Sequence, residues 1–330
     1  MKTLFKPLLG LASLAFALAA NAQQPHLRIQ DYPGIVGTLT RVAVEKGYCE
    51  QAGIKCSIQV INTAPLGIQT LLSKDIEVSL ANVEVALQAA QRGAKLKVIA
   101  SSMKSNPFML AVGNHVSWPN LKRGYPDAVK DLKGRKIGVT ARGSAAEFQA
   151  RLMLTGAGLN ANEVTFVAVG APLTGYAALS NGQVDALLSF LPIDGFCDVL
   201  KTCTMAVQPH KGEGPRQLTR LNNGSGATYV VREDFLQSNP AAVRSFLSAL
   251  EKAGRFAQDP QNLPELLAIT NKYSPVSLPQ GDQILRSSLA NFQKGFSMQL
   301  EEDTQSAVVD YLVETGQLPG KVEGLQLLLR

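Results

Sequence analysis

Strand-like and helix-like segments alternate along this chain, and the alternation constrains the fold more than any other feature. Residues 27–30 predict a first strand, Leu39, Val42 and Ala43 give the next segment one apolar helical face, and residues 57–61 predict a second strand. Parallel strands need long crossover connections, which helices usually supply. We therefore expect an α/β protein whose mostly parallel sheets are flanked by helices.

The alternation stops and then restarts, and the two halves share short identical segments. Segments 64–66 and 72–73 recur at 171–173 and 179–180, an offset of 107 positions, and each set leads into an apolar strand. Chance identities are the alternative. Five identities at one offset, in the same structural position, favour two lobes of the same architecture.

Two loop-rich segments, at residues 114–125 and 211–225, divide the chain. Everything after residue 238 has helical patterning. The expected division is a signal peptide at 1–22, lobe 1 at 23–113 and 226–330, and lobe 2 at 114–225. Two crossings then join the lobes, near residues 113–116 and 222–227, and we expect the lobes to close about them like a hinge.

The first 22 residues have the composition of a secretory signal peptide. Lys2 and Lys6 precede an apolar run at 8–20, and residues 20–22 read Ala-Asn-Ala, a typical cleavage site. A transmembrane anchor is the alternative, but the run is too short to span about 30 Å of hydrocarbon. Because no cysteine stands at the cleavage site, we expect a periplasmic protein without a lipid anchor.

The four cysteines form two local pairs, Cys49 with Cys56 and Cys197 with Cys203. In an oxidising compartment, an even number of closely paired cysteines indicates disulfides. Each bridge would close a short helix-to-strand loop. Four buried thiols are the alternative.

Composition and charge exclude several classes of protein. A chain with 45% hydrophobic and 18% charged residues is ordinary for a globular protein. The formal charge of +6 falls to +4 without Lys2 and Lys6, and the basic residues are scattered, so no nucleic-acid partner is expected. The three histidines are far apart and lack metal-ligand spacing, so we expect no metal, and no motif indicates a cofactor.

Three segments carry a resemblance to a known family. They are the run Arg-Val-Ala-Val-Glu-Lys-Gly at 41–47, the lysine-glycine turn at 131–139, and Gly-Gln-Val-Asp-Ala at 182–186. In this order and spacing they resemble the nitrate, sulfonate and taurine class of ABC-transporter substrate-binding proteins. The resemblance implies the two-lobed periplasmic-binding-protein fold of type II, with two hinge crossings and a ligand held in the cleft.

Helix starts beyond strand ends are the first places to look for ligand contacts. In open α/β sheets ligands bind beyond the carboxyl ends of strands, and helix N-termini suit anions. The candidates of this kind are Tyr32, Pro33, Gly34 and Ile35 in the first loop, Ala64 and Asn82 at two later helix starts, and Arg142, Gly143, Ser144 and Ala145 in a strand-to-helix turn of lobe 2.

The turn at 142–145 also has a purely structural interpretation. Arg142 could contact a carboxylate or sulfonate, or it could be a surface arginine. Ser144 and Glu147 have the spacing of a capping box, in which the two side chains accept hydrogen bonds from backbone N–H groups at the start of the helix. Glu147 would also repel a nearby anion.

Three further candidates come from other elements. Phe190 ends a strand of lobe 2 and could form an apolar wall or pack in the core. Thr174 lies near the start of the helix that begins at Pro172. Asn223 precedes the return strand, as a ligand-facing hinge residue or a loop residue.

Two classes of function remain. The first is a monomeric solute-binding protein that captures a small anionic organic molecule and delivers it to an ABC-transporter permease in the inner membrane. The second is an exported or biosynthetic enzyme on the same two-lobed scaffold, since a fold alone does not fix function. No catalytic motif such as G-x-S-x-G or H-E-x-x-H occurs, so a non-enzymatic carrier is the preferred interpretation.

Overall fold

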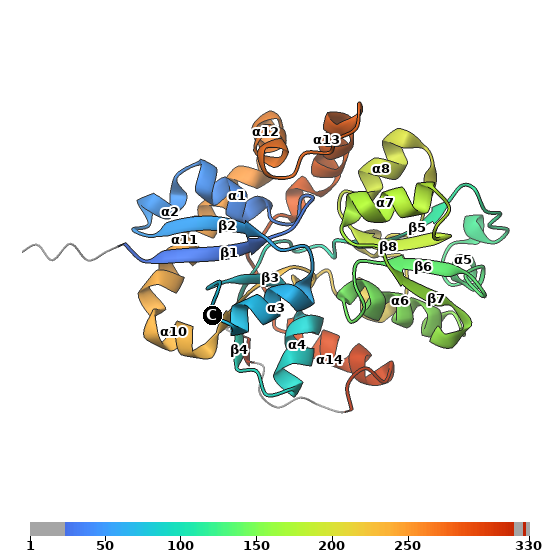
Figure 1. The fold of residues 1–330 in the computed structure, drawn as a ribbon, viewed down its shortest axis with the longest axis horizontal. Helices are drawn as coiled ribbons and strands as arrows, with labels where there is room; N and C mark the ends of the chain where they lie inside the picture. The colour runs from blue at the N-terminus through green and yellow to red at the C-terminus, as the bar shows by residue number, and fades with distance from the viewer. Residues whose placement is uncertain (1–23, 320–325, 328–330) are drawn as a thin grey trace, which may run out of the picture.

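The computed structural model describes residues 24–319 and 326–327, so the expected signal peptide lies outside the described residues. The two larger sheets form separate halves of the molecule, with helices on their faces (Figure 1). This is the expected α/β architecture. No helix within the described ranges has the length and apolarity needed to cross a membrane.

The elements follow one another in three blocks. The first block contains β1 (His26–Asp31), α1 (Thr38–Glu45), α2 (Tyr48–Gln51), β2 (Lys55–Val60), α3 (Ala64–Leu72), β3 (Ser79–Ala81), α4 (Val83–Gln91) and β4 (Leu96–Ser101). The second contains β5 (Phe108–Gly113), α5 (Asp127–Lys130), β6 (Lys136–Val139), α6 (Ala145–Gly156), β7 (Thr165–Ala168), α7 (Pro172–Ser180), β8 (Ala186–Phe190), α8 (Ile193–Leu200), β9 (Cys203–Val207) and α9 (Arg216–Thr219). The third contains β10 (Thr228–Arg232), α10 (Glu233–Ser238), α11 (Pro240–Gln258), α12 (Leu263–Tyr273), α13 (Gly281–Phe292), α14 (Thr304–Glu314) and β11 (Gln326–Leu327).

The two halves have the same strand order. In lobe 2 the order is β7-β6-β8-β5-β9, with β5 antiparallel to β8 and β9. In lobe 1, β3-β10-β4 are adjacent, β10 is antiparallel to both neighbours, and a parallel bridge from Ile29 to Val78 connects the β1–β2 pair to this sheet. The repeated segments at 64–66 and 171–173 begin α3 and α7, which occupy the same place in the two lobes. The expectation of a common architecture is confirmed.

One strand lies in a different lobe from the one expected. The sequence predicts that β5 is the last strand of this part of lobe 1, which ends at residue 113. Its hydrogen bonds go to β8 and β9 instead, so it is a strand of the second sheet. The first crossing is therefore at residues 102–107, before β5, and not at 113–116. Periodicity identifies a strand but does not say which sheet receives it.

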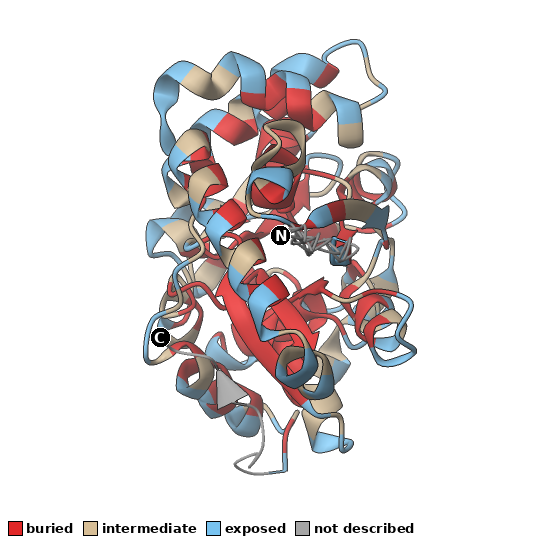
Figure 2. Cartoon of the chain, turned by 90° about the vertical axis from the view of Figure 1, so that its left-hand side faces the viewer, coloured by how far each residue is buried: buried red, intermediate tan, exposed pale blue. Residues whose placement is uncertain are grey.

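The C-terminal helices cover lobe 1 and also reach lobe 2. The amphipathic α11 and the shorter α12 pack on α1, whereas α13 packs on α8 of the second lobe. At that contact Asp194 accepts hydrogen bonds from Ser288 at 2.6 Å and Asn291 at 3.0 Å. Buried residues concentrate on the strands and on the inward faces of the helices (Figure 2).

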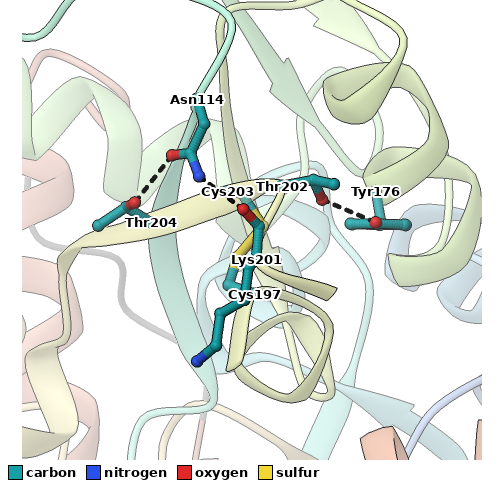
Figure 3. The surroundings of a disulfide bond; sticks show 7 residues. All are labelled: Asn114, Tyr176, Cys197, Lys201, Thr202, Cys203 and Thr204. Atoms are coloured by element: carbon teal, nitrogen blue, oxygen red, sulfur yellow. Dashed lines mark hydrogen bonds between the residues drawn. A yellow bond between two sulfur atoms is a disulfide. The ribbon is translucent and has the colours of Figure 1, made fainter. Parts of the chain in front are cut away.

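Both expected disulfides are present. Cys49 of α2 is bonded to Cys56 of β2, and Cys197 of α8 to Cys203 of β9, with Cα atoms 6.0 and 4.9 Å apart. Side chains around the second bridge also hold the turn between α8 and β9 (Figure 3). Asn114 donates to the Lys201 carbonyl and accepts from Thr204, both at 2.8 Å.

Removal of either bridge is expected to lower stability moderately. Each bridge closes a loop of only six or seven residues, so replacing both of its cysteines by serine should lower the free energy of unfolding by about 2–3 kcal/mol. Denaturant unfolding of each double variant measures this change. Alkylation of the unreduced, denatured wild type should label no cysteine, and rapid labelling would contradict the assignment.

Candidate ligand-binding site

A small, partly open space lies between the two lobes, beside both crossings. Its open volume is about 30 Å³. The residues that line it are Tyr32, Val36, Asn62, Thr63, Ala64, Leu80, Ala81, Asn82, Pro107, Phe108, Thr140, Ser144, Ala145, Phe190, Gly226 and Ala227. We call this space the inner cavity. Because small-molecule sites usually measure hundreds of cubic ångströms, an organic ligand requires the lobes to move apart.

A buried ion pair shapes the loop that forms one wall of the cavity. Arg41 and Asp31 are both fully buried, and Arg41 Nε donates to Asp31 Oδ2 at 2.7 Å. The same guanidinium donates to the carbonyls of Gly34, at 2.6 Å, and Tyr32. A Cβ on Gly37 would lie 1.7 Å from Asp31 Oδ1, so only glycine fits there. The ion pair, the two contacts to carbonyl groups and the close approach of Gly37 thus fix the loop that carries Tyr32 and Val36 into the cavity.

Aromatic rings form the apolar side of the cavity. Phe190 makes edge-on contacts with Tyr32, at a centroid distance of 5.7 Å, and with Phe108, at 5.9 Å. The Tyr32 hydroxyl is buried and has no hydrogen-bond partner among the described residues. The nearby Gln30 amide is already engaged, since it donates to the carbonyls of Ile61 and Thr63. Burial raises the pKa of Tyr32, so the hydroxyl stays protonated and can donate to a ligand.

The N-terminus of α6 lies at the cavity without a side-chain cap. The Ser144 hydroxyl donates to the Ala141 carbonyl at 2.7 Å instead of accepting from the helix. Glu147 accepts from Gly143 N at 2.9 Å and does not reach back to the Ser144 amide. The capping box suggested by the sequence is therefore not formed, because both side chains have other partners. The first N–H groups of α6 keep the capacity to bind an anion.

The other two helix starts at the cavity are arranged differently. Thr63 caps α3 by accepting from Leu66 N at 3.4 Å. Asn82 stands at the N-cap position of α4, but its side chain donates to the Gly226 carbonyl and does not cap the helix. Asn82 thus connects the end of β3 to the second crossing.

The structure brings only part of the expected site together. The candidates that line the inner cavity are Tyr32, Ala64, Asn82, Ser144, Ala145 and Phe190. Those that do not are Pro33, Gly34, Ile35, Arg142, Gly143, Thr174 and Asn223.

The candidates outside the cavity have structural partners. Gly34 donates to Ser274 Oγ at 2.5 Å and packs against the Leu191 carbonyl. Asn223 is buried, and its amide donates to Asp303 at 3.2 Å. Thr174 is exposed, and its hydroxyl donates to the carbonyl of Ala171, the N-cap residue of its own helix.

Arg142 and Gly143 line a second space, which we call the outer groove. It has a volume of about 830 Å³ and lies between α3 and α4 of lobe 1 and α6 of lobe 2. Arg142 pairs with Glu147 at 3.0 Å, lies over the Phe166 ring and has a side chain that is 57% exposed. The same Glu147 pairs with Arg151 at 2.7 Å. Arg142 is therefore on the outer side of the turn, away from the inner cavity.

Sequence reasoning missed the lining residues that belong to the crossings. Pro107, Phe108, Gly226 and Ala227 come from or border these segments. Recognition of the first crossing at 102–107 would have identified two of them. Asn62, Thr63 and Thr140 also lie just beyond strand ends. The rule that ligands bind beyond the carboxyl ends of strands, which identified Ala64 and Asn82, therefore applies to them too.

Comparison with known proteins decides the family. A family model described as NMT1/THI5 like matches residues 38–263, which is more than half of the chain. The chain belongs to the NMT1/THI5-like family. A Brucella abortus protein whose name assigns it provisionally as a binding protein is 24% identical over 260 residues, covering 79% of this chain and 74% of that protein.

Solved structures share the fold of this NMT1/THI5-like chain. The alkanesulfonate-binding protein SsuA from Xanthomonas axonopodis, bound to MOPS, has a TM-score of 0.73 at 18% identity, covering 92% of this chain and 98% of that one. The periplasmic nitrate-binding protein NrtA from Synechocystis has a TM-score of 0.70 at 14% identity, covering 90% and 83%. The expected resemblance to the nitrate, sulfonate and taurine class is confirmed.

An enzyme shares the fold as well. The desulfurization enzyme DszB has a TM-score of 0.60 at 16% identity, covering 90% of this chain and 94% of that one. The NMT1/THI5-like fold is therefore compatible with both of the functional classes considered above, and the lining of the site has to discriminate between them.

The buried ion pair behind the cavity wall predicts a large effect on stability. Arg41→Met should lower the free energy of unfolding by about 3–5 kcal/mol, because it leaves the Asp31 carboxylate buried without its counter-ion. Arg255→Met is the matched control, since Arg255 forms an exposed pair with Glu251 and should contribute less than about 1 kcal/mol. Denaturant unfolding compares the two, and equal effects would contradict this role for Arg41.

Proposed function

We propose that this protein binds a small anionic organic molecule in the inner cavity and delivers it, in the periplasm, to the permease of an ABC importer. The observation that carries the proposal is a cavity built by both lobes at their crossings, with unsatisfied donors in its wall. The sulfonate- and nitrate-binding proteins that share the fold support the ligand class. The monomeric state expected from the sequence is part of the proposal.

Two donors are proposed to hold the anionic group. The N–H groups at the start of α6, next to Ser144 and Ala145, carry the positive end of the helix dipole. The Tyr32 hydroxyl supplies a hydrogen bond from the opposite lobe. Because the two donors come from different lobes, a ligand that engages both favours a form in which the lobes enclose it with a wider spacing than in the structure, which is how ligand binding shifts such an equilibrium.

The lining favours a carrier over an enzyme. Among the described residues that line the inner cavity there is no His, Cys, Asp, Glu, Lys or Arg. The Ser144 hydroxyl donates to a backbone carbonyl, and no lining side chain could act as its general base. Nucleophilic and acid–base catalysis need such a partner within hydrogen-bond reach.

Native mass spectrometry of the protein recovered from its own periplasm tests the proposal. The expected result is a small anionic compound that is released on denaturation and recovered chemically unchanged after long incubation with the protein. Conversion of the compound would favour the enzyme. Failure of the protein to retain or rebind any anionic compound would contradict the carrier.

Removal of the unpartnered hydroxyl in the cavity should weaken binding without weakening the fold. Tyr32→Phe should reduce affinity for the recovered ligand about tenfold or more, since a hydrogen bond to a charged group contributes roughly 1.5–3 kcal/mol. Tyr125→Phe is the matched control, because the Tyr125 hydroxyl is also buried without a partner but lies outside the cavity. Calorimetry measures both affinities, and equal values would remove Tyr32 from the proposed site.

Arg142 is proposed to act only from the outer groove. Arg142→Ala should change the equilibrium affinity less than about threefold, because the side chain is largely exposed and already paired with Glu147. It should slow ligand association at low ionic strength, where long-range attraction of anions is strongest. Stopped-flow fluorescence measures the rate, and a loss of affinity of tenfold or more would place Arg142 at the ligand.

A further inference from the structure

A chain of buried hydrogen bonds connects the two lobes beside their crossings. In the crossings, Asn106 N donates to Asn222 Oδ1 at 2.8 Å, and Asn106 Nδ2 donates to Gln149 Oε1 at 3.0 Å. Gln149 of lobe 2 then donates to Glu84 Oε1 of lobe 1 at 3.0 Å, and the Tyr311 hydroxyl donates to the same oxygen at 2.7 Å. The side chains of Glu84, Gln149, Asn106 and Tyr311 are fully buried. This chain of hydrogen bonds therefore exists only while the lobes are together.

The Glu84 carboxyl at the centre of this chain of hydrogen bonds has no counter-ion in the part of the protein that the structure describes. The neighbouring α3 carries no ionisable residue, and Tyr311 of α14 is the titratable group that faces the carboxyl. The ionisable groups on the other elements packed against α4 have partners elsewhere: Glu147 with Arg151 on α6, Asp310 of α14 with Arg220, Glu314 of α14 with Gln217, and Lys97 of β4 with Glu233. Glu84 Oε2 has no hydrogen-bond partner among the described residues.

A carboxyl in this environment is more stable as the neutral acid. An ionised carboxylate buried without a cation loses its hydration and gains no compensating charge. Burial accordingly raises the pKa of Glu84, and the bonds from its own backbone amide, Tyr311 and Gln149 offset this only in part.

We propose that Glu84 is a positioning residue that holds the lobes closed as a neutral acid, so that opening of the cleft releases a proton. Opening separates Glu84 from Gln149 and admits water, which returns the pKa of the carboxyl toward its ordinary value of about 4.3. The closed form then binds a proton that the open form does not. The contribution of Glu84 to closure is complete below the pKa of the open form and is lost as the pH rises to the raised pKa of the closed form. Between these two values the equilibrium constant for closing falls about tenfold for each pH unit.

The coupling goes beyond the proposed function, because it concerns the lobes themselves and not the identity of the ligand. It can therefore be tested on the protein alone. Infrared spectroscopy detects the carbonyl band of a protonated carboxyl, and small-angle scattering measures the radius of gyration. Both are recorded from about pH 5 to about pH 9, which covers the range of carboxyl pKa values raised by burial.

Glu84→Gln is the decisive variant, because it replaces the neutral acid by a neutral amide of the same shape. In the wild type, the band should persist above the ordinary carboxyl range, and its loss should coincide with an increase in the radius of gyration. Burial also raises the pKa of Asp194, so in Glu84→Gln the band should lose only the part contributed by Glu84, and the radius should stay small at every pH. Glu314→Gln, an exposed carboxyl on α14, should behave as the wild type.

A second variant keeps the carboxyl and removes its partner in the other lobe. Gln149→Leu should shift the increase in radius to lower pH, because it breaks the bond between the lobes and leaves Tyr311 in place. The proposal is overturned if the wild type shows no protonated carboxyl above the ordinary range, if the band is as strong in Glu84→Gln as in the wild type, or if the radius does not follow the loss of the Glu84 part of the band.

Discussion

The ion pair between Arg41 and Asp31 fixes the surface of lobe 1 on which the candidate site depends. Asp31 ends β1 and Arg41 belongs to α1, so the pair closes the turn between them. Through Gly34 the same loop meets the Leu191 carbonyl of lobe 2 and Ser274 beyond α12. A fully desolvated pair adds little net stability, because its desolvation offsets most of its attraction. The consequence of the Arg41–Asp31 pair is geometric, because it holds the loop in the conformation in which both charges are satisfied.

The crossings determine where the cavity can lie. Each sheet contains one antiparallel strand that arrives from the other side of the molecule, β5 in lobe 2 and β10 in lobe 1. The chain immediately before each strand contributes Pro107, Gly226 and Ala227 to the cavity wall. Movement of one lobe against the other must therefore change the shape of the cavity directly. Asn82 moves with the second crossing, because its side chain donates a hydrogen bond to the Gly226 carbonyl.

The sequence predicts the features that depend on local pattern and misses those that depend on long-range contacts. Alternating strands and helices, the repeat at an offset of 107, and two closely spaced cysteine pairs are local, and the structure agrees with them. The sheet that receives β5 is decided by hydrogen bonds to β8 and β9, far along the chain. Arg142 illustrates the same limit, because the turn that carries it was identified but the direction of its side chain depends on Glu147 and Phe166.

A cavity without charged side chains restricts the charge of the ligand that it can enclose. A dianion would be buried with partial charges alone to balance it, whereas one delocalised negative charge matches a helix N-terminus and a hydroxyl donor. Glu84 stands in the first turn of α4, two residues after the lining residue Asn82. An ionised carboxylate at that position would repel an anion in the cavity. A neutral Glu84 removes that repulsion, so protonation of this carboxyl also favours an anionic ligand in the cavity as pH falls.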